Sequence, residues 1–105
     1  MAVATVLRVF LTDVARPRYG YDLMGATRFP SGKLYPILAR LTRAGWLRRY
    51  KEENVDPVAE GRPARFMYVL TEEGTRAARL ELAALVQQVT PPAPQLRLRP
   101  ERGRA

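Results

Sequence analysis

Few side chains in this sequence could carry out covalent or metal chemistry. The chain has no histidine and no cysteine, and Ser31 is its single serine. Imidazole and thiol groups are the usual general bases, nucleophiles and transition-metal ligands of proteins, and none is present here. The sequence therefore predicts no enzyme, no catalytic residue, no metal ligand and no cofactor.

The chemistry that remains is hydrogen bonding to an anion. Lysine and arginine number 18 against 10 aspartates and glutamates, a formal net charge of +8. Most of these cations are arginines, whose planar guanidinium group binds phosphate and guanine bidentately. A nucleic-acid partner and a merely solvated basic surface both fit this composition. The absence of cysteine also fits a reducing compartment.

The densest group of candidate donors lies in the segment SGKLYPILARLTR, residues 31–43. At helical spacing its large apolar residues form one stripe, which predicts a core-facing side: Leu34, Ile37, Leu38 and Leu41. The opposite side carries small or flat residues, which let a helix axis approach another surface closely, with donors around them. We expect the following residues of this helix to contact DNA: Ser31, Lys33, Tyr35, Ala39, Arg40 and Arg43.

This segment has one alternative interpretation that stays open and one that its spacing excludes. Gly32 and Pro36 would cost a helix interior about 1 and about 3 kcal/mol, and they could merely shape the preceding turn while the basic residues stay solvated. A phosphate-binding loop at residues 31–33 is excluded by spacing. Thr27 stands where the first glycine is required, and Leu34 follows Lys33 in place of serine or threonine.

Apolar periodicity predicts helices over residues 2–15, 19–27, 31–44 and 71–89. Ser31 is the expected N-cap of the third helix, and Gly45 its expected end. Thr71, followed by two glutamates, is expected to cap the last helix. The short turn at residues 28–30 makes the second and third helices a helix-turn-helix candidate.

Residues 46–51 and 64–70 are aromatic and β-branched, and they predict a two-stranded hairpin with a long polar loop over residues 52–63. Phe66, Tyr68 and Leu70 should share one face of the second strand. Arg62 and Arg65 lie at the far end of this hairpin. Their types are typical of a wing that lays arginine beside or into a minor groove, and a solvated loop is the alternative.

The last predicted helix is apolar on more than one side. Ala78, Leu82, Leu85 and Val89 recur at intervals of four, three and four residues, like the seam of a coiled coil. Such a helix can cover its own core and also meet a second protomer, or it can simply fold back on the first helix. Residues 91–105 are rich in proline and arginine and predict a disordered basic tail.

Several motifs together resemble the winged-helix regulators of the PadR family. They are GYDLM at 20–24, SGKLYPILARL at 31–41, GW at 45–46 and GRPARFMYVLTEEG at 61–74, and the likeness covers about residues 5–80. It implies a bacterial homodimeric transcription factor, usually a repressor, that binds an inverted-repeat operator. It places Ser31, Lys33 and Tyr35 at the groove and Arg62 and Arg65 on the wing.

The resemblance also implies that the first and last helices form the dimer and that some members bind apolar effectors there. The expected dimer contacts are therefore Val3, Val6, Leu7, Phe10, Ala78, Leu82, Leu85 and Val89. Thr42 stands where members often carry an acid. The single C-terminal helix resembles the short subfamily, which leaves effector binding open.

The sequence as a whole predicts a mainly α protein with a small β-hairpin. Residues 1–70 should form a winged helix-turn-helix domain and residues 71–90 a C-terminal dimerisation helix, followed by the tail at 91–105. The favoured function is a sequence-specific transcriptional regulator that binds double-stranded DNA as a homodimer. The alternative is a winged-helix module that binds other proteins. No apolar run is long enough for a membrane span and the N-terminus lacks a signal-peptide layout, so we expect a cytoplasmic protein.

Overall fold

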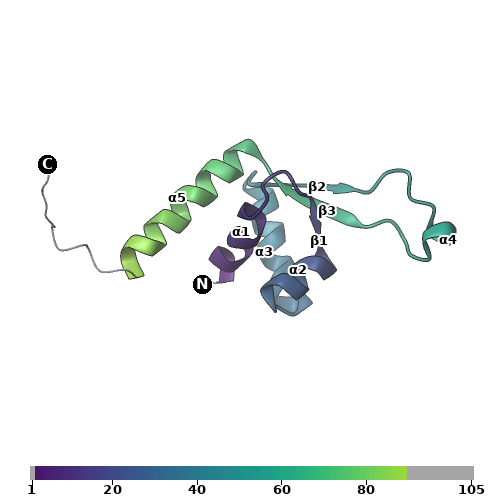
Figure 1. Ribbon diagram of the computed structural model, residues 1–105, viewed down its shortest axis with the longest axis horizontal. Helices are drawn as coiled ribbons and strands as arrows, with labels where there is room; N and C mark the ends of the chain where they lie inside the picture. Colours follow the sequence, from purple (N-terminus) through teal and green to yellow (C-terminus); the bar gives the residue numbers. More distant parts are fainter. Residues whose placement is uncertain (1, 90–105) are drawn as a thin grey trace, which may run out of the picture.

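The computed structural model describes residues 2–89, and side chains through residue 86. The predicted basic tail lies outside the described residues. The elements in chain order are α1 (Ala2–Leu11), β1 (Arg18–Tyr19), α2 (Gly20–Thr27), α3 (Ser31–Arg43), β2 (Leu47–Lys51), α4 (Pro57–Glu60), β3 (Phe66–Leu70) and α5 (Glu72–Val89) (Figure 1). The predicted class, mainly helical with a small antiparallel sheet, is confirmed.

The sheet has three strands in the order β1-β3-β2, one more than the predicted hairpin. β2 and β3 are antiparallel, in a register that runs from Leu47 opposite Leu70 to Lys51 opposite Phe66. β1 pairs Arg18 with Tyr68 on the other edge of β3. Figure 1 shows the long β2–β3 connection extending as a wing beyond the helices, with the one-turn helix α4 near its tip. Neither β1 nor α4 was predicted.

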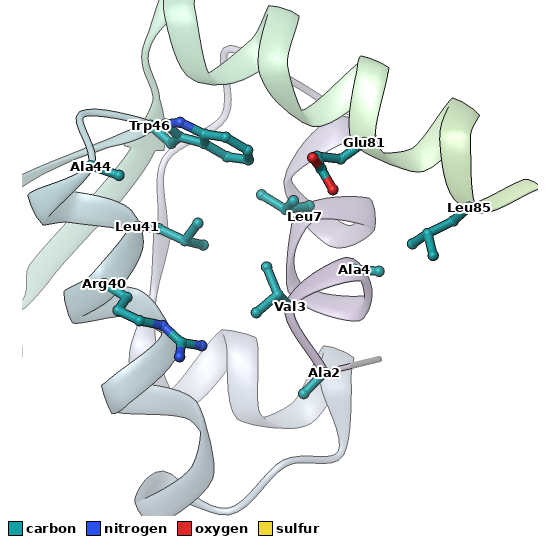
Figure 2. A pocket seen from close by; sticks show the side chains of 10 residues that line it. All are labelled: Ala2, Val3, Ala4, Leu7, Arg40, Leu41, Ala44, Trp46, Glu81 and Leu85. Carbon is teal, nitrogen blue, oxygen red and sulfur yellow. The ribbon is translucent and has the colours of Figure 1, made fainter.

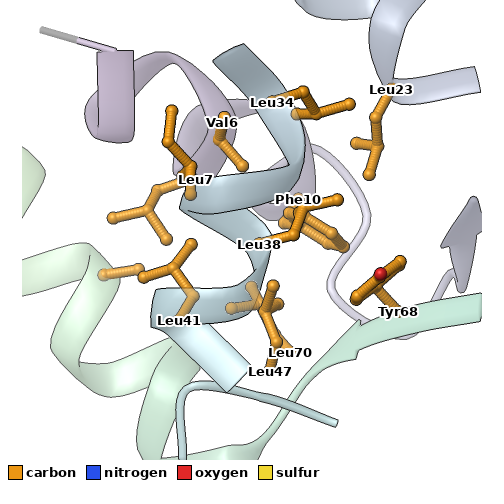
Figure 3. Close-up of a cluster of buried hydrophobic side chains, with 12 residues drawn as sticks. Val6, Leu7, Phe10, Leu23, Leu34, Leu38, Leu41, Leu47, Tyr68 and Leu70 are labelled. Atoms are coloured by element: carbon orange, nitrogen blue, oxygen red, sulfur yellow. The ribbon is translucent and has the colours of Figure 1, made fainter. Parts of the chain in front are cut away.

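The hydrophobic core lies where α1, α2 and α3 meet the inner part of the sheet (Figure 3). The apolar stripe predicted for α3 is buried in full. Its neighbours in this core include Phe10 of α1, Leu23 of α2, and Leu47 and Leu70 of the sheet. Because one side of α3 is occupied in this way, its opposite side is the one left to meet solvent or a ligand.

Three predictions about helix ends were wrong: the end of the first helix, the start of the second, which is Gly20 rather than Tyr19, and the cap of the third. α1 ends at Leu11 rather than residue 15, because the amide and the hydroxyl of Thr12 both donate to the Val9 carbonyl, at 3.3 and 2.7 Å, and close the last turn. Ser31 is the first residue of α3 rather than its cap. The N-cap is Pro30, which forms no side-chain capping bond.

Gly45 ends α3 as predicted. Its φ of +81° lies in the left-handed region that glycine adopts most readily. The amides of Gly45 and Trp46 donate to the carbonyls of Thr42 and Leu41, at 3.1 and 3.0 Å, which is the Schellman pattern. This turn directs the chain from the recognition-helix candidate straight into β2.

α5 is anchored on that same turn. The Thr71 hydroxyl accepts a hydrogen bond from the Gly74 amide at 2.9 Å, the predicted cap, and donates to the Gly45 carbonyl at 2.6 Å. The Thr71 amide donates to the Trp46 carbonyl at 3.0 Å. A Cβ atom at Gly74 would overlap that carbonyl group. The start of α5 is thereby docked on the end of α3, backbone against backbone.

A buried ion pair fixes β1 to α2. Arg18 is 7% exposed, and its guanidinium binds both carboxylate oxygens of Asp22 at 2.8 and 3.1 Å and donates to the Val9 carbonyl at 3.4 Å. The hydrogen bond from Arg18 lowers the pKa of Asp22 below its usual value.

No helix within residues 2–89 has both the length and the apolar character needed to span a membrane.

Candidate nucleic-acid interface

The exposed side of α3 is the one that the sequence predicts. Gly32, Pro36, Ala39 and Arg43 are all exposed, and the helix continues without interruption past Pro36. No large side chain stands between Gly32 and Ala39 on this side, so the backbone can approach another surface closely. A helix of this kind fits a DNA major groove, which is about 12 Å wide.

Lys33 is exposed in the first turn of α3, next to the helix N-terminus. Its ammonium nitrogen lies 4.4 Å from the centre of the Phe29 ring, within the range of a cation–π contact. Phe29 is held in turn by its amide, which donates to the Thr27 hydroxyl at 3.1 Å. The turn between α2 and α3 thus supports a cation beside free helix N–H groups, an arrangement that favours anions.

Tyr35 is 44% exposed, and the tip of its ring lies against α2. A Cβ atom at Gly20 would collide with the Tyr35 phenol oxygen, so the ring tip packs directly on the backbone of Gly20. Tyr35 therefore fastens α3 to α2, and nearly half of its surface stays exposed. No pattern in the sequence indicates that Gly20 and Tyr35 are in contact.

Arg40 is exposed on α3 like the other predicted DNA-contacting residues of this helix, but it also has a second neighbourhood. It lines an apolar pocket of about 570 Å³ between α1, α3 and α5, on a different side of α3 from Ala39. Figure 2 shows the Arg40 guanidinium pointing into this pocket, with Trp46 and Glu81 on other walls. The ten residues around the pocket are Ala2, Val3, Ala4, Leu7, Arg40, Leu41, Ala44, Trp46, Glu81 and Leu85.

Arg62 and Arg65, predicted at the far end of the hairpin, both bind Glu52. Arg62 Nη1 lies 2.8 Å and Arg65 Nε 3.3 Å from Glu52 Oε1, and the Arg65 amide donates to the same oxygen at 2.9 Å. Hydrogen bonds from the Arg62 side chain and the Arg65 amide lower the pKa of Glu52 to about 2. Glu52 raises the pKa of Arg65 in return. These guanidinium groups are part of the wing's own structure.

Sequence reasoning missed three other exposed cations on the wing. Arg48, Arg49 and Lys51 all lie on β2 and are exposed. The run RRYK was visible in the sequence, but it was interpreted only as part of a strand. The alternation of strand residues across the sheet could have shown that these cations lie on two different faces.

Seven of the eight residues expected at a dimer contact have described side chains, and these seven divide into two groups. Val6, Leu7, Phe10 and Ala78 are covered by their own chain, with exposed fractions between 0 and 1%. They therefore offer almost no surface to a second protomer, since each contributes to the protomer's own core. Val3, Leu82 and Leu85 are half-buried. Val89 ends α5, and its side chain is outside the described set.

Comparison with known proteins supports one assignment. The model of the transcriptional regulator PadR-like family matches residues 7–80. No curated protein matches the sequence. The smu.1704 protein of Streptococcus mutans UA159 is 28% identical, with a TM-score of 0.64 over 85% of this chain and 80% of that one. A PadR-like transcription factor from Bacteroides fragilis is 26% identical, with a TM-score of 0.58 over 80% and 81%.

A more distant structure shows the shared fold in the presence of DNA. An Escherichia coli MarR mutant in complex with operator DNA is 24% identical, with a TM-score of 0.61 over 84% of this chain. The match spans 56% of that longer chain, so it is evidence of fold alone. The family model covers well over half of the sequence, including α2, α3 and the wing. This chain belongs to the PadR-like family of transcriptional regulators, which are DNA-binding winged-helix proteins and not enzymes.

Proposed function

We propose that this protein is a homodimeric repressor that binds an inverted-repeat operator through the exposed side of α3. The observation that carries the proposal is the contrast between the two sides of that helix. One side is buried in full, whereas Gly32, Pro36 and Ala39 form a flat exposed strip on the other. Such a strip, with cations at both ends, suits insertion into the major groove.

The roles proposed on α3 follow from position along the helix. Ser31 and Lys33 lie in its first turn, where side chains and free amides can reach phosphate and base edges. Tyr35, which is 44% exposed, lies two residues beyond Lys33 and is suited to a contact with base edges. Ala39 sets how closely the helix approaches the DNA, and Arg43, in the last turn, is suited to a phosphate contact.

A dimer is proposed because α1 and α5 pack on each other and leave apolar side chains at their surface. Val3, Leu82 and Leu85 are half-buried, and Val86 of α5 is 60% exposed. A second copy could cover this apolar surface with the same residues, as a two-fold axis requires. Two copies would then place two α3 helices on two half-sites one helical turn apart.

Selection from a pool of random-sequence duplexes tests the proposal. The expected result is enrichment of an inverted repeat by the wild-type chain, which sediments as a dimer at micromolar concentration. The double variant Leu82→Glu/Leu85→Glu should sediment as a monomer and enrich no repeat, because two half-sites no longer act together. Leu80→Glu is the matched control, since residue 80 lies on the opposite side of α5.

Two outcomes would contradict the proposal. If the wild-type chain sediments as a monomer and enriches single half-sites, the proposed dimer and the proposed inverted-repeat operator are both wrong. Enrichment of no sequence at all, with binding that vanishes at moderate salt, would favour the protein-binding alternative, because non-specific phosphate contacts are strongly salt-dependent.

We also propose that a small apolar effector binds in the pocket between α1, α3 and α5. Arg40, Leu41 and Ala44 line the pocket from α3 itself, so an occupant could shift the recognition helix. Trp46 is the single tryptophan of the chain and also lines the pocket. Its fluorescence should therefore change on titration with the apolar dye anilinonaphthalene sulfonate.

The pocket variant Ala4→Trp should fill the space and abolish that fluorescence change. Ala26→Trp, on the exposed surface of α2, is the control for the added ring. Equal dye responses in the wild type and both variants would show that the dye binds elsewhere, and the effector would be dropped from the proposal.

A further inference from the structure

The wing has two faces that differ in what they carry. Strand residues that stand opposite each other share a face, and successive residues alternate. Leu47 and Leu70 are opposite each other in the core, so their face is the helix-side face. Arg49 and Lys51 share it, since they pair with Tyr68 and Phe66, respectively. Arg48 pairs with Val69 and belongs to the outer face.

The Glu52 cluster, composed of Glu52, Arg62 and Arg65, lies at the outer face. Arg65 precedes Met67 by two residues, and its guanidinium carbon lies 4.0 Å from the centre of the Tyr19 ring. Tyr19 is paired with Met67, an outer-face residue, so this contact places Arg65 on the outer face. The Glu52 amide donates to the Arg65 carbonyl at 2.8 Å and continues the strand register.

The loop that the Glu52 cluster closes is acidic. Glu53, Asp56 and Glu60 are exposed, and residues 53–61 contain no lysine or arginine. The Asp56 carboxylate accepts a hydrogen bond from the Val58 amide at 3.1 Å, but this neutral donor leaves the negative charge of the loop in place. A phosphate backbone would repel this tip, which argues against insertion of the loop into a minor groove.

The helix-side face carries cations that no carboxylate neutralises. Within residues 2–89 the ion pairs involve neither Arg49 nor Lys51. The Arg49 guanidinium carbon lies 3.9 Å from the centre of the Phe66 ring, which is itself 45% exposed and stands opposite Lys51. The ring holds the guanidinium in place while its N–H groups stay available.

The placement of the wing decides which face a duplex would meet. In Figure 1 the wing extends past the helices at an angle to them, with α2 and α3 on one side of it. The buried stripe of α3 packs against Leu47 and Leu70 of the sheet, so a duplex on the opposite side of α3 would lie on the same side of the sheet as the helices and meet the helix-side face of the wing. The outer face would point away from it.

We propose that the wing grips the DNA backbone through Arg49 and Lys51 on its helix-side face, while the Glu52 cluster serves to close the loop. This inference rests on the proposed function, in which α3 receives the duplex. It replaces the sequence-based expectation that Arg62 and Arg65 are the wing contacts.

The test is the salt dependence of binding to a random-sequence duplex of about 30 base pairs, measured for single variants of the full chain. Arg49→Ala and Lys51→Ala should each weaken binding several-fold and make the log–log salt slope shallower by about 1, the signature of one lost phosphate contact. Arg48→Ala is the matched control, because it removes the same charge from the adjacent residue on the outer face. Arg48→Ala and Arg62→Ala should keep the wild-type slope.

Three results would overturn the inference. Equal slopes for Arg48→Ala and Arg49→Ala would mean that only net charge matters. A shallower slope for Arg62→Ala, with Arg49→Ala unchanged, would return the contact to the loop arginines. A wild-type chain that fails to bind the duplex even at low salt would overturn the proposed function as well. Thermal melting of every variant excludes misfolding as the cause.

Discussion

Replacing Ala39 with glutamate is expected to abolish DNA binding and leave the fold intact. Ala39 is exposed and lies opposite the buried stripe of α3, so the larger side chain meets no core residue. Exposed substitutions of this kind usually change stability by less than about 0.5 kcal/mol. When α3 binds DNA, the same carboxylate would lie next to phosphates and fill the space that allows the helix to approach the groove closely.

The expected loss of affinity is large. Like charges brought together in an interface cost several kcal/mol, so we expect a loss of at least about 3 kcal/mol, or roughly 100-fold. Fluorescence anisotropy with the selected operator measures it. Ala15→Glu is the matched control, because residue 15 is an exposed alanine in the turn after α1. Wild-type affinity in a folded Ala39→Glu variant would mean that α3 is not the recognition helix.

The second large effect is expected at Gly74, where a single methyl group should destabilise the whole protein. The Cβ of Gly74→Ala would overlap the Trp46 carbonyl, which is backbone and cannot move aside like a flexible side chain. That carbonyl also accepts the hydrogen bond from the Thr71 amide. Relief of the overlap would pull α5 away from the turn that ends α3.

Overpacking of this kind costs about 1–3 kcal/mol, and occasionally more. In a domain of this size a loss of about 2–3 kcal/mol lowers the melting temperature by about 10 °C or more. Gly25→Ala is the control, because a Cβ there would meet no atom within 4 Å. In the interior of α2 it should raise stability by about 0.5–1 kcal/mol. Equal melting temperatures for the two variants would show that the contact between Gly74 and the Trp46 carbonyl can relax without loss of stability.

Local sequence determined the four long helices and the two strands of the wing, together with the division of α3 into two sides. Helical periodicity depends only on residues three and four apart, so the buried stripe and the exposed strip could be located in advance. The Thr71 cap and the Gly45 end were predictable for the same reason, since each bond spans only a few residues. The motifs that resemble the PadR family lie in these same segments.

Contacts between distant residues were decided only by the tertiary structure. β1 is two residues long and exists because β3 has a free edge beside Arg18 and Tyr19. Glu52 meets Arg65 across thirteen positions of sequence, and Gly20 meets Tyr35 across fifteen. No local pattern encodes such pairs, because their partners are chosen by how the elements pack.

In the candidate interface, too, local sequence determined some features and tertiary structure decided the others. Helical periodicity placed Lys33, Tyr35 and Ala39 on the side of α3 that the structure leaves exposed. It placed Arg40 with them, and Arg40 is also exposed, but periodicity could not show that the guanidinium points into the pocket between α3 and α1. It placed the loop arginines on the wing, but the register of β2 against β3 decided that Arg49 and Arg65 lie on opposite faces. Side-chain direction in a strand changes with every residue, so only the pairing of the strands could settle which cations face the helices.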